Sequence, residues 1–456
     1  MGPFLILAPS SGKLDAPTRK QVRSHVMRGK NRKHPKRRGN ALVGSWINDE
    51  PPDAVQSSPE CAPTQFIPPR VGHDLSHVPF VEEMNPHTLE LIFKFFTVLK
   101  RAMYPVEACV QPSDGQWVEY LAYDRAYLSS TLCTTQSFFD YVRNATLSEK
   151  AVYHLNNTLQ TLRENLADPY FATSDSTIST VLTLVILADV IDDRNAAKRH
   201  AQGLYQLVQL RGGIAALRHN RELQVKVLRA DLGVAINAGS KPFFFSDGFS
   251  WEPYLIPRTT VPSPNTPPPA NPTTNPSTPP TFPILITDPR LLNILHDLQE
   301  FSLAANLASQ TGCSIPAPLF HETLVSVQYR LLALRDEDDF DDDSDHTHRM
   351  DASPARLLRL GMLAFSTTTF LQIQQLPLRY ADLARRMRGC VRRLGRVGEA
   401  SLSQEEARLA LWFLFVATVS VLGGEGDEEG VVGAARRVAG GLGLGGVECR
   451  MELASR

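Results

Sequence analysis

The densest concentration of one kind of chemistry in this sequence is a block of cations near the N-terminus. Ten of the twenty residues from 19 to 38 are Lys or Arg and none is acidic. They are Arg19, Lys20, Arg23, Arg28, Lys30, Arg32, Lys33, Lys36, Arg37 and Arg38. Residues 1–50 carry 11 basic and 3 acidic side chains, a local charge of +8, although the whole chain has a net charge of −1. Such a block favours nucleic acid, a nuclear import receptor or an acidic membrane surface as partner; a solvated tail with no partner is the alternative.

Residue types that bind metals or perform covalent catalysis do not occur at the spacings that such sites need. The six cysteines include no CxxC pair, and the sequence holds no HExxH, GxSxG or P-loop pattern. The acidic run at 336–345 has eight carboxylates in ten residues but lacks the glycine and the final Glu of a calcium loop. We therefore expect no catalytic residues, no metal and no cofactor.

A glycine-rich sequence, GLGLGG at 441–446, formally matches the dinucleotide-binding fingerprint. That fingerprint works between a strand and a helix, where the helix N-terminus receives the pyrophosphate. No strand pattern precedes the glycines, and only ten residues follow them. We interpret the sequence as a glycine-rich tail.

The segment HAQGLYQLVQLRGG at 200–213 combines polar side chains with a helix-end signal. Apolar residues at helical spacing share one face with Arg211, and Gly212 is placed as a left-handed C-cap. Gly213 would then turn the chain toward the next helix. We expect His200 and Arg211 to be caps beside the core and not a ligand site.

The elements that must position these residues are predicted to be helices. Apolar residues recur at three- and four-residue spacings from Asn85 onward, and Asn85-Pro86 is a helix-start signal. Little alternating pattern occurs, so we predict an all-α fold with one core of roughly twelve helices. After the first, they are expected at about 116–133, 146–166, 176–192, 196–211, 221–238, 289–309, 317–335, 354–375, 378–394, 403–422 and 430–440.

The chain divides into an arm, a linker and a helical domain. Residues 1–50 are predicted to be a basic arm, largely disordered or a short helix, and 51–84 a Pro-rich linker. The helical domain, 85–456, is interrupted by a Pro-rich disordered insertion at 257–283 and an acidic loop at 336–348. The longest uncharged apolar run has about 16 residues, fewer than the roughly 20 that cross a bilayer, so no membrane association is expected.

An ordered set of motifs resembles the fungal-specific transcription factor domain, the helical regulatory region that follows zinc-cluster DNA-binding domains in fungal regulators. The motifs are Phe4 with Arg19–Lys33, Tyr104-Pro105, Trp117, Asp124–Leu128, residues 200–213, Arg229–Leu232 including Asp231, Lys241–Phe243 and Trp412–Leu414. They span most of residues 1–30 and 80–425, with the arm typical of a subgroup that has no zinc cluster. The six-cysteine cluster that gives the family its sequence-specific DNA recognition is missing.

The resemblance implies a nuclear, helical, regulatory protein without catalytic residues. Our first hypothesis is a transcription-regulator-like protein whose helical domain binds a partner protein or an effector. Its arm would provide nuclear import and non-specific phosphate contact with DNA. The second hypothesis is a helical interaction scaffold that does not bind DNA, and an enzyme of unknown chemistry is a third.

Overall fold

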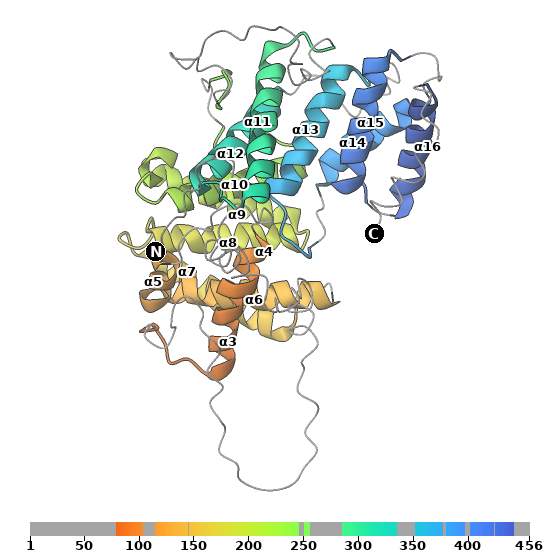
Figure 1. Cartoon of the computed structure of the whole chain (residues 1–456). Coiled ribbons are helices and arrows are strands. Elements are labelled where there is room, and N and C mark those ends of the chain that lie inside the picture. Colours follow the sequence, from red (N-terminus) through yellow and green to blue (C-terminus); the bar gives the residue numbers. More distant parts are fainter. Residues whose placement is uncertain are drawn as a thin grey trace, which may run out of the picture. The chain divides into compact units, whose positions relative to one another are not determined.

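The computed structural model describes residues 79–103, 115–144, 146–245, 250–255, 285–334, 352–376, 380–396, 402–423 and 425–441. Within these ranges the chain forms helices and no strand, so the all-α prediction is confirmed (Figure 1). The helices are α3 (Pro86–Lys94), the π-helical turn η2 (Phe95–Leu99), α4 (Lys100–Ala102), α5 (Gly115–Tyr123), α6 (Arg125–Asn144), α7 (Glu149–Ala167), α8 (Asp175–Val190), α9 (Arg194–Leu210), the 3-10 turn η3 (Ile214–Leu217), α10 (Arg221–Ala238), α11 (Pro289–Thr311), α12 (Ala317–Ala333), α13 (Pro354–Phe370), α14 (Ala381–Leu394), α15 (Gln404–Val419) and α16 (Glu425–Gly441).

The predicted arm (1–50), the Pro-rich insertion (257–283) and the acidic loop (336–348) lie outside the described residues, as do 442–446 of the glycine-rich sequence. Of the predicted linker, residues 79–84 are described. Phe80, Val81 and Met84 pack against buried side chains, and the Val81 N–H donates to the Leu121 carbonyl at 3.2 Å. The chain is therefore already packed a few residues before α3 begins.

Side chains that accept backbone N–H groups start the helices where the sequence offers Asn, Ser or Asp. Asn85 accepts from the Thr88 N–H ahead of α3, as its pairing with Pro86 predicts. Ser403 and Glu406 form a reciprocal capping box at the start of α15. Each cap satisfies donors that the first helical turn cannot pair internally.

The prediction of one helix over 116–133 was wrong, because Asp124 divides the segment. Helix α5 ends at Tyr123, and α6 then runs to Asn144. The Asp124 carboxylate accepts the Tyr127 N–H at 3.0 Å and two contacts from Asn165 Nδ2 at 3.2 Å. An N-capping side chain inside an apolar pattern starts a new helix.

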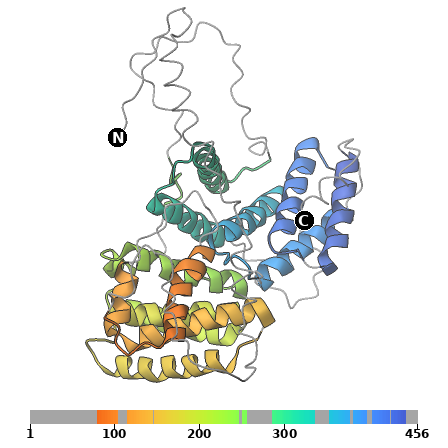
Figure 2. The same cartoon turned by 60° about the horizontal axis from the view of Figure 1, so that its bottom comes forward.

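Buried apolar side chains form two clusters that share α10. One joins α3 to α9, and the other joins α11 to α16. Leu223, Val227 and Val234 of α10 belong to the first cluster, whereas Leu232 and Ile236 belong to the second. Helix α10 is therefore apolar on two sides and packs in both clusters. Figures 1 and 2 show α13, α14, α15 and α16 grouped side by side in the second.

The second cluster contains a buried ion pair that fixes a loop. Arg330 Nη2 lies 2.5 Å from Asp297 Oδ2, and the two side chains are 2% and 0% exposed. Asp297 also accepts the N–H groups of Tyr254 at 2.9 Å and Leu255 at 2.8 Å. These contacts tie residues 254–255 to α11 and α12, and they supply the hydrogen bonds that a buried charge needs.

Candidate functional site

The ten cationic residues predicted to contact nucleic acid or an import receptor lie outside the described residues. The motif at 200–213 and Asp231 lie within them. The structure therefore places the helical part of the predicted site and leaves the arm as a prediction.

The end of α9 has the geometry that the glycines predict. The Gly212 N–H donates to the Gln209 carbonyl at 3.0 Å and the Gly213 N–H to the Val208 carbonyl at 2.8 Å. Both glycines have positive φ, 110° and 83°. This pair of hydrogen bonds is the Schellman motif, and the positive φ explains why two glycines stand together.

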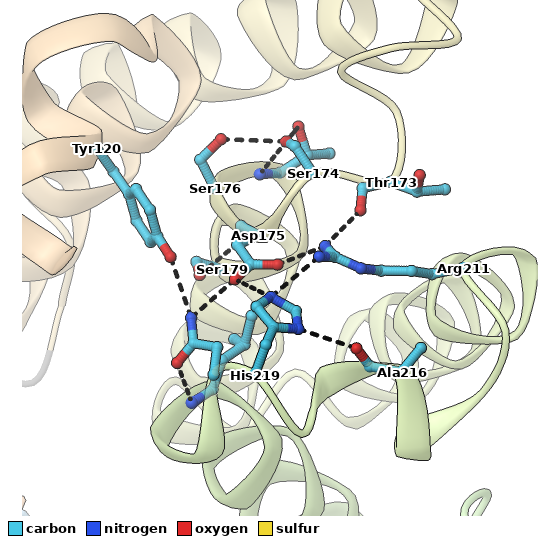
Figure 3. Close-up of polar contacts among 12 residues, drawn as sticks. Tyr120, Thr173, Ser174, Asp175, Ser176, Ser179, Arg211, Ala216 and His219 are labelled. Atoms are coloured by element: carbon cyan, nitrogen blue, oxygen red, sulfur yellow. Dashed lines mark hydrogen bonds and ion pairs between the residues drawn. The ribbon is translucent and has the colours of Figure 1, made fainter.

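Arg211 joins this helix end to the start of α8 (Figure 3). Its Nη1 donates to the Thr173 carbonyl at 2.8 Å and forms an ion pair with Asp175 Oδ1. Asp175 is the first residue of α8, where a carboxylate also interacts favourably with the helix dipole. The expectation that Arg211 is a cap beside the core agrees with these contacts.

Asp175 is the centre of a larger polar network, which we call the Asp175 network. His219 Nε2 lies 3.0 Å from Asp175 Oδ2, and Asn220 Nδ2 donates to the same oxygen at 2.8 Å. Asn220 also donates to the Tyr120 hydroxyl at 3.1 Å. Figure 3 shows these side chains converging from α5, α8, the end of α9 and the start of α10. The network therefore connects four helices at one place.

The Asp175 network does not have the arrangement of a nucleophile and base. The second ring nitrogen of His219, Nδ1, lies 3.0 Å from the Ala216 carbonyl, so its polar contacts in the described structure are to a carboxylate, a carbonyl and Arg211. Ser174 contacts Ser176 and Thr177 at 3.1 Å and caps α8 instead. A serine needs a base within hydrogen-bonding reach to be activated. The contacts of this network hold the ends of neighbouring helices together.

His200 lies in α9 and is half-buried. Burial, with a smaller contribution from neighbouring Arg199, lowers the pKa of the His200 imidazole below its ordinary value. The charged groups that act on this pKa are Arg199 and Asp193, which are not members of the Asp175 network. His200 and Arg211 are thus not brought together into one site.

Asp231 fastens a loop to α10 and α12. Its two carboxylate oxygens accept the N–H groups of Phe243 at 2.8 Å and Phe244 at 2.9 Å, and the Tyr329 hydroxyl donates to it at 2.8 Å. Burial raises the pKa of Asp231 although these three hydrogen bonds oppose the shift. The residue is 2% exposed, so its role in the described structure is internal.

A mostly apolar cavity lies elsewhere, between η2–α4, α5, α6, α8, α10 and the segment that follows α13. It consists of two adjoining pockets that share Met103, Ile186, Val190, Lys226, Ile373 and Leu376. They offer about 70 Å³ and about 90 Å³ of space for the centres of water-sized molecules. The Gln374 N–H donates to the Ala102 carbonyl at 2.8 Å and so holds the last wall in place. We call this space the Lys226 cavity.

The first pocket of the Lys226 cavity has an unusual pair of polar groups. Lys226 Nζ lies 2.8 Å from Glu222 Oε1 and 3.6 Å from the centre of the Trp117 ring. Burial lowers the pKa of Lys226 to about 8, and Glu222 opposes that shift. Trp117 is 4% exposed, and its Nε1–H has no hydrogen-bond partner among the described residues. A buried donor without an acceptor costs free energy and calls for an explanation.

The second pocket is more polar and is lined by Arg229, Asp189, Asn237 and Tyr380 besides Lys226. Asn237 Nδ2 donates to Asp189 Oδ1 at 2.9 Å, and Arg229 Nη2 donates to a backbone carbonyl at 2.8 Å. Burial raises the pKa of Asp189 above its ordinary value. Cationic groups and an apolar wall thus meet within the Lys226 cavity.

No cluster of three or more His, Cys, Asp or Glu side chains that could hold a metal ion occurs in the described part of the chain. No helix in that part is long and apolar enough to cross a membrane. Comparisons with models of protein families, with curated proteins and with solved structures found no match to this chain. Functional inference therefore rests on the residues themselves.

The sequence prediction named Trp117 and Arg229 as parts of family motifs but did not predict a cavity between them. Lys226 and Glu222 were not singled out at all. One signal was present, since Lys226 lies in the helix segment LQVKVLRADL, which is otherwise largely apolar. A cation inside such a pattern must reach a partner or a cavity.

Proposed function

We propose that this chain is a nuclear, transcription-regulator-like protein whose helical domain binds an effector and whose basic arm provides nuclear import. The observation that carries the proposal is the block of ten cations without an acidic residue at 19–38. A segment of this charge is attracted to phosphate and to the acidic grooves of import receptors. The resemblance to the fungal-specific transcription factor domain supports the same function.

The helical domain supports a binding role more than a catalytic one. Its most connected polar cluster, the Asp175 network, fastens helix ends. Its Lys226 cavity combines apolar walls with a few polar groups, as small-molecule sites do. We therefore assign effector binding to the helical domain and no reaction.

A helical interaction scaffold that does not bind DNA is the second candidate. Two observations favour it. The residues after position 50 carry a net charge of −9, since the arm holds +8 of a total of −1, and such a domain repels phosphate. Large apolar side chains are also exposed, among them Tyr170 at 83% and Leu210 at 76%.

Nuclear import is tested with a fluorescent reporter fused to residues 1–50. The fusion should accumulate in the nucleus, and replacing Lys36, Arg37 and Arg38 by Ala should weaken the accumulation. In the full chain, the same triple substitution should reduce nuclear accumulation. A matched substitution of three exposed cations in the helical domain (Lys198, Arg199 and Arg218) should leave it unchanged. An even distribution of the fusion between cytoplasm and nucleus would contradict the proposal.

DNA contact separates the first candidate from the scaffold. If about five arm cations reach phosphates, log K plotted against log salt should fall with a slope of roughly −4 to −5. Scrambling the DNA sequence should change affinity by less than about tenfold, because phosphate contacts carry no base readout. Deleting residues 1–50 should abolish binding. Sequence-selective binding by the deleted chain would place a DNA-reading element in the helical domain instead.

A further inference from the structure

We propose that the Lys226 cavity binds a small monocarboxylic acid with an apolar body, its carboxylate directed to Lys226 and Arg229 and its body held among the apolar walls. The inference rests on the proposed effector-binding role of the helical domain and specifies the chemical class of the effector. The size of the cavity, the charge of its lining and the Trp117 N–H, which has no acceptor among the described residues, support it.

The size of the cavity limits the ligand to a few carbon atoms beyond its carboxylate. The two pockets, about 70 Å³ and 90 Å³, are of the order of an engineered apolar cavity of roughly 150 Å³ that admits benzene. A single aromatic ring or a short alkyl chain fits this space. Nucleotides and long acyl chains do not.

The charge of the lining selects an anion. Lys100 and Arg229 both lie close enough to Lys226 to lower its pKa, so three cations are grouped around one space. On the acidic side, Glu222 pairs with Lys226, and burial raises the pKa of Asp189 above its ordinary value. A ligand carboxylate entering beside Lys226 and Arg229 would offset repulsion among the cations and form charge-assisted hydrogen bonds.

The apolar walls argue against a strongly hydrated anion such as inorganic phosphate. Phe96, Leu99, Leu182 and Leu187 line the first pocket together with Trp117, and each of them is less than 9% exposed. Apolar surface of this kind gains free energy when it covers the apolar body of a ligand. A monocarboxylate with one ring or chain presents both kinds of surface that the cavity offers.

Trp117 supplies an independent observation. It is 4% exposed and lines the first pocket, and its Nε1–H has no acceptor in the described part of the chain. The ammonium of Lys226 lies 3.6 Å from its ring centre. Buried indole N–H groups ordinarily have partners. A carboxylate oxygen within reach of this donor would supply the acceptor that the described residues do not provide.

The test is calorimetric titration of the full chain at pH 7 with matched acids and amides: benzoate against benzamide, and hexanoate against hexanamide. The acids should bind about tenfold or more tightly than the amides, because a hydrogen bond to a charged group is worth more than one to a neutral group. Tryptophan fluorescence should change on binding, and the change should be lost in Trp117→Phe but kept in Trp251→Phe.

Three variants locate the ligand. Lys226→Met should abolish the preference for acid over amide, whereas Lys198→Met, at an exposed lysine of α9, should leave it unchanged. Ile186→Phe should fill the space shared by both pockets and remove binding of acids and amides alike. The comparison of acid with amide on the unaltered chain decides the question even if a variant fails to fold.

Equal affinity for acid and amide would overturn the inference, as would the absence of benzoate and hexanoate binding up to about 10 mM. A preference for acid that persists in Lys226→Met would place the anion elsewhere and overturn it too. The proposed function fails separately, through the loss of nuclear accumulation by the 1–50 fusion. Nuclear accumulation without acid binding would remove only the ligand assignment.

Discussion

The Asp175 network and the Lys226 cavity are two places where polar side chains meet between helices, and they differ in how completely those groups are paired. Asp175 contacts Arg211, His219 and Asn220 at once: in the described part of the chain its Oδ1 forms an ion pair with Arg211 and no hydrogen bond, and its Oδ2 meets His219 and Asn220. In the cavity, the Trp117 N–H has no acceptor within the described ranges, and the ring lines open space. A completed network stabilises the ends of helices. An incomplete one beside a cavity retains the capacity to bind something else.

The largest effect is expected from breaking the completed network. Asp175→Ala should lower the free energy of unfolding by about 2–4 kcal/mol, because it leaves Arg211 without its carboxylate and Asn220 without one acceptor. Urea denaturation monitored by circular dichroism measures this change.

The matched control is Asp427→Ala. It breaks the ion pair with Arg388, whose side chain is 47% exposed, and it should cost less than about 1 kcal/mol. Similar losses in the two variants would show that the Asp175 network is worth no more than a surface pair.

The next largest effect is the pH dependence of benzoate binding in the Lys226 cavity, which tests whether Lys226 holds the ligand. The pKa of Lys226 is lowered to about 8, and a bound carboxylate favours the ammonium and raises that pKa. The complex then holds a proton that the free protein releases above pH 8. Benzoate affinity should therefore be flat from pH 6 to 7.5 and fall up to about tenfold per pH unit above 8.

The control must separate Lys226 from the other titrating groups around it. Glu222, Lys100 and Arg229 act on the pKa of Lys226 through their charges, and Asp189 has a raised pKa of its own. Calorimetry at pH 7 and pH 9 should show the fall in Asp189→Asn and not in Lys226→Met. If the fall in benzoate affinity disappears in Asp189→Asn, the titrating group is Asp189 and the assignment to Lys226 is wrong.

The smallest effect tests whether the Asp175 network tolerates the loss of a peripheral member. Tyr120→Phe removes one acceptor of Asn220 Nδ2, which still donates to Asp175 at 2.8 Å. The loss in unfolding free energy should be about 0.5–1.5 kcal/mol. Tyr153→Phe, at a side chain 62% exposed, should change it by less than about 0.5 kcal/mol. Urea denaturation that shows a loss as large as that of Asp175→Ala would mean that the Tyr120 hydroxyl is a central and not a peripheral member of the network.

Local signals in the sequence predicted the helices well because caps and periodicity act over a few residues. Asn85-Pro86 began α3, and Gly212-Gly213 ended α9, as expected. The error at 116–133 arose where apolar periodicity continued past Asp124, whose capping role was not weighed against the pattern. A single N-capping side chain can therefore start a new helix even where the apolar periodicity continues.

The candidate site could be predicted only in part, because its contacts join distant parts of the chain. The glycines at 212 and 213 showed where α9 ends, but Arg211 meets Asp175, 36 positions earlier in the sequence. The Lys226 cavity has walls from residue 95 to residue 380. Helical periodicity indicates which side of a helix is buried, but the space left between packed helices depends on side-chain shapes that only the tertiary structure brings together.

Helix α10 gives the chain a property that neither cluster has alone. Its two apolar sides pack in different clusters, with Leu223 and Val227 in one and Leu232 and Ile236 in the other. A chain cleaved between residues 255 and 285 would leave α10 on the first fragment with one apolar side uncovered. The helices of the second fragment can pack against that uncovered side of α10. The two fragments should therefore reassemble when they are co-expressed. The protein is therefore suited to fragment complementation, in which α10 provides the apolar surface that the second fragment binds.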